Sequence, residues 1–119
     1  MTDAAIGRRH SQRDALLAKA RDWAARAGPM LDARAIVVVG SVARGDFNKW
    51  SDLDLLVVAD GLPAGLGDRL VLLGPTEKPP GVEAIVWTPA ELRQRTRRAT
   101  DPIAREAFTA GAVVYGSLP

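Results

Sequence analysis

The sequence contains no cysteine, a single histidine and no long hydrophobic run. Without cysteine the chain can form neither disulfides nor thiolate metal sites, and it has no cysteine nucleophile. His10 would have to carry any Ser-His-Asp triad or multi-histidine metal site alone, near a chain terminus, which argues against both. The longest apolar stretches, residues 35–39 and 53–59, fall far below the roughly 18 residues that span a bilayer. We therefore expect a cytoplasmic protein with no export signal and no contact with a membrane.

Aromatic residues are also scarce, at 5% of the chain. Platforms on which single-stranded nucleic acid could stack are therefore few, and a formal net charge of +2 is too small to predict nucleic-acid binding, although it does not exclude it. What the chain does have is 47% hydrophobic and 25% charged residues, the composition of an ordinary globular protein. A length of 119 residues predicts one domain over residues 1–119.

Hydrophobic periodicity predicts a mixed α/β (α+β) domain. The strands are expected at residues 35–39, 52–59 and 82–87, with a short terminal strand at 112–115. An amphipathic helix is expected over 11–27, ended by Gly28-Pro29, and further helices over 89–98 and 102–110. Residues 64–73 could form a short helix or a further strand, and we favour the helix. Thr88, Pro89 and Glu91 form a capping-box pattern at the start of the helix that follows the third strand. The fold class is thus a small mixed sheet of three core strands and a terminal strand, flanked by helices.

The segment from Gly40 to Val58, GSVARGDFNKWSDLDLLVV, carries the chemistry. A glycine after a buried strand lets the backbone approach a bulky ligand closely. Ser41 offers a hydroxyl, and a helix beginning there would offer free N–H groups to a phosphate. Because side chains alternate along a strand, Asp52 and Asp54 are expected on one face, where both can bind a hard cation such as Mg²⁺.

A third carboxylate is expected from a neighbouring strand, and Glu83 is the candidate. It is a charged residue within an otherwise apolar strand, and burying it would be costly unless it were paired or bound to metal. Beside Asp52 and Asp54 it could bind metal and act as general base toward an acceptor hydroxyl. The three acids together would hold two Mg²⁺ ions in a phosphoryl-type transfer.

These residues resemble the nucleotidyltransferase superfamily that includes DNA polymerase beta, and most closely its minimal nucleotidyltransferases. The shared pattern is an apolar strand, Gly-Ser, a spacer with Ala-Arg-Gly, then Ser-Asp-apolar-Asp and a second apolar strand. The resemblance implies that Gly40 and Ser41 bind the triphosphate, and Arg44 and Ser51 are further candidate nucleotide ligands. It also implies that Asp52 and Asp54 bind Mg²⁺, with Glu83 in the third acidic position, where the family more often has aspartate.

Each candidate also has a structural interpretation. Asp52 and Asp54 could belong to a solvated strand edge, Glu83 could be an exposed residue of an edge strand, and Arg44 could pair with Asp46 or Asp52. Residues 49 and 50 could flank the cleft or simply pack in the loop. The arginines that follow the third strand could form a solvated helix face, or they could contact nucleotide, RNA or a partner; they are Arg93, Arg95, Arg97 and Arg98.

We therefore expect an enzyme that moves a nucleoside monophosphate, AMP from ATP, to an acceptor hydroxyl and releases pyrophosphate. Larger members of the superfamily add a helical domain, for which this length leaves no room, so a partner is expected. The resemblance implies a small helical HEPN-domain protein as that partner, with this chain as the antitoxin that adenylylates it. A partner-binding module without turnover, and an enzyme that modifies a small molecule such as an aminoglycoside, if need be as a homo-oligomer, are the alternatives.

Overall fold

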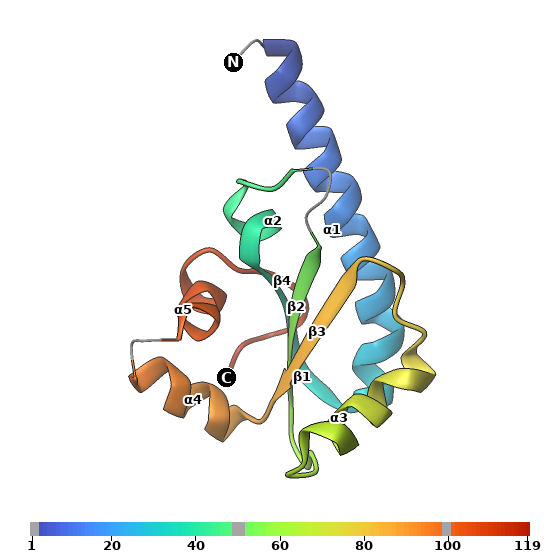
Figure 1. Ribbon diagram of the computed structural model, residues 1–119, viewed down its shortest axis with the longest axis vertical. Coiled ribbons are helices and arrows are strands. Elements are labelled where there is room, and N and C mark those ends of the chain that lie inside the picture. The colour runs from blue at the N-terminus through green and yellow to red at the C-terminus, as the bar shows by residue number, and fades with distance from the viewer. Residues whose placement is uncertain (1–2, 49–51, 99–100) are drawn as a thin grey trace.

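The computed structural model describes residues 3–48, 52–98 and 101–119. Helices and strands follow one another in the predicted order (Figure 1). Their bounds are α1 Asp3–Leu31, β1 Ala33–Val39, α2 Gly40–Arg44, β2 Leu53–Ala59, α3 Leu66–Leu73, the 3-10 turn η1 Gly74–Thr76, β3 Val82–Trp87, α4 Pro89–Arg97, α5 Pro102–Thr109 and β4 Ala112–Gly116. None of the helices in these ranges is both long and apolar enough to cross a membrane.

The strands form one mixed sheet in the order β3-β2-β1-β4. Strand β1 is antiparallel to both of its neighbours, while β2 and β3 are parallel. In this register Asp54 pairs with Val39 on one side and with Glu83 on the other. The end of β1 and the starts of β2 and β3 therefore meet at one end of the sheet.

Helices cover the two faces of the sheet in separate layers (Figure 1). Helices α1 and α3 pack on one face, over a core that includes Trp23 and Leu55. Helices α4 and α5 pack on the other face, over a core that includes Leu56 and Trp87. Because strand side chains alternate between faces, Asp54 shares its face with Leu56 and thus lies on the side that α5 covers.

The first helix is longer than the sequence predicted. It was expected over residues 11–27, yet α1 runs from Asp3 to Leu31 with Pro29 inside it, so Gly28-Pro29 does not end the helix. Gly28 instead makes room for a ring from β4, because a Cβ on it would lie 2.4 Å from Tyr115 Cε2. Asp32, at φ +51°, takes the left-handed conformation just beyond the helix.

The capping box predicted at the start of α4 is confirmed. Thr88 Oγ1 accepts the N–H of Glu91 at 3.1 Å, and Glu91 Oε1 accepts the N–H of Thr88 at 2.8 Å. Glu91 also pairs with the buried Arg69 at 2.8 Å, and Arg69 donates to the carbonyl of Val86 at 3.1 Å. These contacts fix α4 and α3 to the end of β3.

Replacing Thr88 with alanine removes the cap and should lower the free energy of unfolding by about 1 kcal/mol. Urea denaturation in the presence of a chelator measures the loss. Thr109→Ala is the matched control, since Thr109 is exposed and donates only to the carbonyl of Arg105 within α5. An equal loss in both variants would show that the cap contributes nothing specific.

Candidate active site

A close approach between Gly40 and Asp54 defines the candidate site. Gly40 begins α2 directly after β1 and has a φ of +74°, a conformation that favours glycine. A Cβ at this position would lie 2.5 Å from Asp54 Oδ2. The absence of a side chain on Gly40 therefore lets the carboxylate of Asp54 lie directly against the start of α2.

The predicted acids gather at the starts of β2 and β3. Asp54 and Glu83 are direct partners in the register of two parallel strands, whose backbones lie about 4.8 Å apart. Asp52 is exposed and precedes β2, which begins at Leu53 and not at residue 52 as predicted. Asp54 is half-buried, whereas Glu83 is exposed, and the Glu83 side chain makes no hydrogen bond or ion pair with the described residues.

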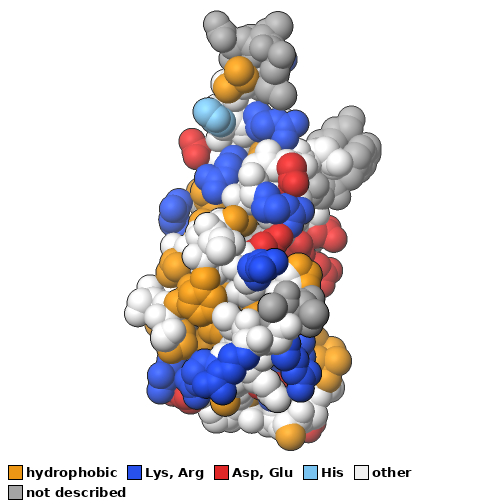
Figure 2. Space-filling view, turned by 90° about the vertical axis from the view of Figure 1, so that its left-hand side faces the viewer, with side chains coloured by type: hydrophobic (Ala, Val, Ile, Leu, Met, Phe, Trp, Pro, Cys, Tyr) orange, Lys and Arg blue, Asp and Glu red, His pale blue; other side chains and the backbone are white. Residues whose placement is uncertain are grey.

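The electrostatics of Asp54 reflect this gathering of like charges. Burial raises the pKa of the Asp54 carboxyl, and the carboxylates of Asp52, Glu83 and Glu106 raise it further, while Arg44 opposes them. Acidic side chains form a visible group on the face that α5 and α2 occupy, bordered by Lys and Arg side chains (Figure 2). The location therefore favours the arrival of a cation.

The acids are of the chemical type that binds a divalent cation, but their side chains are not yet arranged around a common point. Within the described ranges, no three Asp, Glu or His side chains lie close enough together to hold a metal ion as they stand. Carboxylate oxygens at the edge of a sheet are nevertheless the donors that Mg²⁺ prefers. Burial is the largest cause of the raised pKa of Asp54, and the carboxylates around it add to that rise. Glu83, being exposed, is free to turn toward Asp54.

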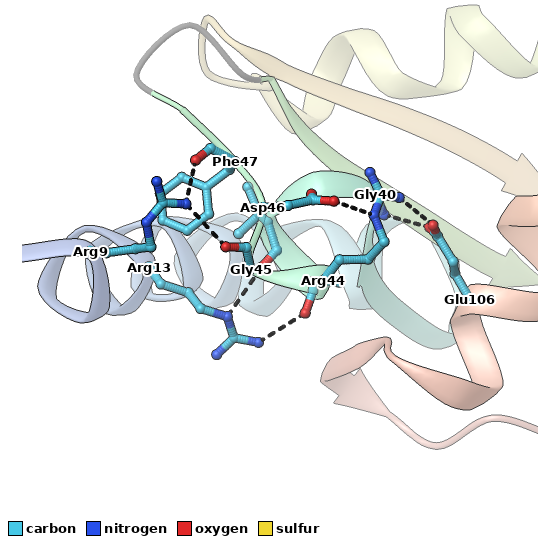
Figure 3. A network of polar contacts seen from close by, with 10 residues as sticks. Arg9, Arg13, Gly40, Arg44, Gly45, Asp46, Phe47 and Glu106 are labelled. Carbon is cyan, nitrogen blue, oxygen red and sulfur yellow. Dashed lines mark hydrogen bonds and ion pairs between the residues drawn. The ribbon is translucent and has the colours of Figure 1, made fainter. Parts of the chain in front are cut away.

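Arg44, at the end of α2, is held by two carboxylates (Figure 3). Its Nε donates to Asp46 Oδ2 at 3.1 Å, and its Nη1 pairs with Glu106 Oε1. Asp46 and Glu106 raise the pKa of the Arg44 guanidinium, which keeps it charged. Glu106 reaches the start of α2 as well, since its Oε2 accepts the N–H of Gly40 at 2.9 Å. The pairing with Asp46 matches the structural interpretation of Arg44.

Two arginines of α1 hold the other end of the turn (Figure 3). Arg13 donates to the carbonyls of Val42 at 3.1 Å and Ala43 at 3.4 Å. Arg9 donates to the carbonyls of Gly45 and Phe47 at 3.1 and 2.8 Å. Positive charge thus meets the carbonyl end of α2 and negative charge meets its amide end, as the helix dipole favours.

Sequence reasoning did not identify Glu106, Arg9 or Arg13. One signal was available for Glu106, because it lies three residues after Ile103 and one before the buried Ala107, on the stripe of α5 that faces the sheet. A charged residue in such a stripe needs a partner. No comparable signal singled out the two arginines, since α1 carries many charges.

The remaining candidates lie in different situations. Ser41 is half-buried, and its carbonyl accepts the N–H of Gly45 at 2.9 Å. Residues 49 to 51, which include the predicted nucleotide ligand Ser51, lie outside the described residues. Arg95 stacks on Trp87, with 4.6 Å between guanidinium carbon and ring centroid, and pairs with Asp101 at 2.9 Å. One member of the arginine cluster therefore has a structural role.

Asp54→Asn should raise the melting temperature of the chelator-treated protein at neutral pH. The raised pKa means that ionised Asp54 destabilises the folded state at high pH. That cost fades as the pH falls through the raised pKa toward the ordinary value of 3.8, because the carboxyl is then protonated. The difference between variant and wild type should therefore shrink in acid.

Thermal melts of both proteins across this pH range measure the effect. Asp22→Asn, at an exposed position of α1, is the matched control and should follow the wild type. An Asp54→Asn protein that melts below the wild type at neutral pH would contradict the electrostatic account.

Comparison with known proteins identifies the family. A sequence model of the nucleotidyltransferase domain matches residues 28–108, a range that includes Gly40, Asp54, Glu83 and Glu106. A comparison with curated proteins finds no match. Among solved structures, the chain is similar to a "putative nucleotidyltransferase" from Sulfolobus solfataricus. The TM-score is 0.65 at 19% sequence identity, over 88% of this chain and 84% of that one, which shows a shared fold.

The matched range covers more than half of the chain and contains the whole β1-α2-β2-β3 unit on which the acids lie. The fold of the Sulfolobus protein agrees with it. The chain therefore belongs to the nucleotidyltransferase domain family.

Proposed function

We propose that this nucleotidyltransferase uses Mg²⁺ to transfer AMP from ATP to a hydroxyl group on a partner protein. The observation that carries the proposal is the contact of Gly40 with Asp54, beside Glu83 on the adjacent strand. It brings the Gly-Ser turn, which resembles a triphosphate-binding element, against the carboxylates that resemble metal ligands. The transfer of a nucleoside monophosphate follows from the family; the metal, the base and the acceptor are the proposed part.

Asp52, Asp54 and Glu83 are the residues that would hold the metal. When bound, Mg²⁺ would supply positive charge to the triphosphate and to the pyrophosphate that leaves. In the transfer, the acceptor oxygen forms a bond to the α-phosphorus while the bond from that phosphorus to the bridging oxygen breaks. The electron pair of the broken bond leaves with pyrophosphate. The proton of the acceptor hydroxyl passes to Glu83, whose exposed carboxylate an acceptor can reach.

The Gly-Ser turn would bind the triphosphate. Ser41 follows Gly40 at the start of α2, and its hydroxyl is a donor for a phosphate oxygen. Arg44, at the other end of α2, would add positive charge. Ser51 is the fourth nucleotide ligand of the proposal.

A protein acceptor is supported by the resemblance to minimal nucleotidyltransferases paired with HEPN-domain toxins. In that arrangement this chain is the antitoxin and the helical partner is the substrate. Two of the three acids, Asp52 and Glu83, are exposed, which suits an acceptor as large as a protein. An aminoglycoside-like small molecule is the second candidate acceptor. Partner binding without turnover is a third hypothesis. The three hypotheses predict different results when the protein is incubated with Mg-ATP.

Wild-type protein incubated with Mg-ATP and the product of the neighbouring gene should add one AMP to that product, as intact mass spectrometry would show. Asp52→Asn with Asp54→Asn should abolish the addition, because both proposed metal ligands lose their charge. Asp60→Asn is a matched control, since Asp60 lies at the far end of β2 and pairs with Arg34 at 2.5 Å. Tight binding with unchanged partner mass would favour the module without turnover. ATP turnover only with a small hydroxyl compound would favour the second acceptor.

Glu83→Gln should lower the rate of transfer at least about 100-fold, because a general base contributes that much or more. The variant should still bind Mg-ATP, since Asp52 and Asp54 remain. The transfer rate and ATP binding by calorimetry measure the two effects separately. If transfer continues at the wild-type rate, Glu83 is not the third acid.

A further inference from the structure

The side chain of Glu106 occupies donors that a triphosphate would use. Its Oε1 pairs with Arg44, and its Oε2 accepts the N–H of Gly40 at 2.9 Å (Figure 3). Its side chain is only 17% exposed, so it is held in place by packing as well as by these contacts. One carboxylate therefore links the first and last residues of α2.

The negative charge of Glu106 is not what a residue that merely supports the binding of an anionic nucleotide would be expected to bring to the site. Its charge adds to those of Asp52 and Glu83 near Asp54. Through its ion pair it also cancels the positive charge that Arg44 could offer. With Asp46 as a second partner at 3.1 Å, Arg44 is paired with two carboxylates without any nucleotide.

We propose that Glu106 is an internal competitor of the triphosphate, which holds Arg44 and the Gly40 amide until a nucleotide displaces it. The proposal rests on the proposed function, because it takes Arg44 as a ligand of the nucleotide. A carboxylate and a phosphate offer arginine the same pair of oxygen acceptors, so the two anions exchange at one guanidinium. Glu106 thus sets how tightly the enzyme binds its nucleotide and disfavours phosphate compounds that arrive without a metal.

A supporting role for Glu106 predicts the opposite sign. If the carboxylate only fixed α2 in place, its loss would loosen the turn and weaken nucleotide binding. If it competes, its loss frees Arg44 and strengthens binding. The direction of the change in affinity separates the two, and a change in stability alone decides neither.

Glu106→Gln is the decisive variant. Glutamine keeps the length of the side chain and one carbonyl oxygen for the Gly40 N–H, but it cannot form the ion pair with Arg44. We expect inorganic tripolyphosphate, titrated by calorimetry in the presence of a chelator, to bind to Glu106→Gln about tenfold more tightly than to the wild type. Mg-ATP should also bind tighter. In Arg44→Gln with Glu106→Gln the gain should disappear, because it acts through Arg44.

Glu91→Gln is the matched control. Glu91 also accepts a backbone N–H, that of Thr88 at 2.8 Å, and also pairs with an arginine, Arg69 at 2.8 Å. It lies in the capping box of α4 and not in the proposed nucleotide site. Its loss should lower the melting temperature and leave the affinity for tripolyphosphate unchanged.

The outcomes separate the two proposals. If wild type binds Mg-ATP and folded Glu106→Gln binds tripolyphosphate equally or more weakly, Glu106 is not a competitor, while the proposed function stands. If neither protein binds Mg-ATP, the proposed function fails. Should Glu106→Gln not fold, Glu106→Asp decides the same question, since a side chain one methylene shorter cannot span both donors. A gain in its affinity for tripolyphosphate would support competition, and no gain would overturn it.

Discussion

A helix of five residues is too short to hold its own shape in water, and the whole site depends on one. Helix α2 forms because groups from distant parts of the chain satisfy it at both ends. The carboxylate of Glu106 meets the amide of Gly40, while Arg9 and Arg13 bind carbonyls at and just beyond its last turn. The charges match the direction of the helix dipole, so the contacts that fix α2 in space also favour its formation.

The register of the sheet then fixes what lies opposite this turn. Strands β1 and β2 are buried along almost their whole length, and a slip of one residue would exchange their side chains between the two cores, which pack against different helices. The same slip would turn Asp54 away from Gly40 and Glu83. Selection for a well-packed core therefore also holds the carboxylates in place, without any dedicated support at the site.

The sequence predicted those parts of the fold that rest on local signals. The strands follow from β-branched apolar runs, and the capping box of α4 from Thr88 and Glu91, which are three residues apart. The end of α1 could not be predicted, because Gly28 is needed for the close packing of Tyr115, a residue from the last strand, and does not end the helix. The contacts that Glu106, Arg9 and Arg13 make with α2 and the residues just after it join positions between 29 and 66 apart. For them a sequence shows charged residues but not their partners, so Glu106, Arg9 and Arg13 were missed while the Gly-Ser and Asp-Leu-Asp motif was found.

Glu91 and Glu106 make the same kinds of contact but have different roles. Each carboxylate accepts a backbone N–H and pairs with an arginine. The partners of Glu91 are the buried Arg69 and the N–H of Thr88 in its own helix cap. These three groups satisfy one another, so the unit is structural. The partners of Glu106 are the first and last residues of a turn that lies against Asp54, where negative charge is already in excess. An anion placed there adds to an imbalance that only a cation can relieve, and a fold keeps such a cost where function needs it.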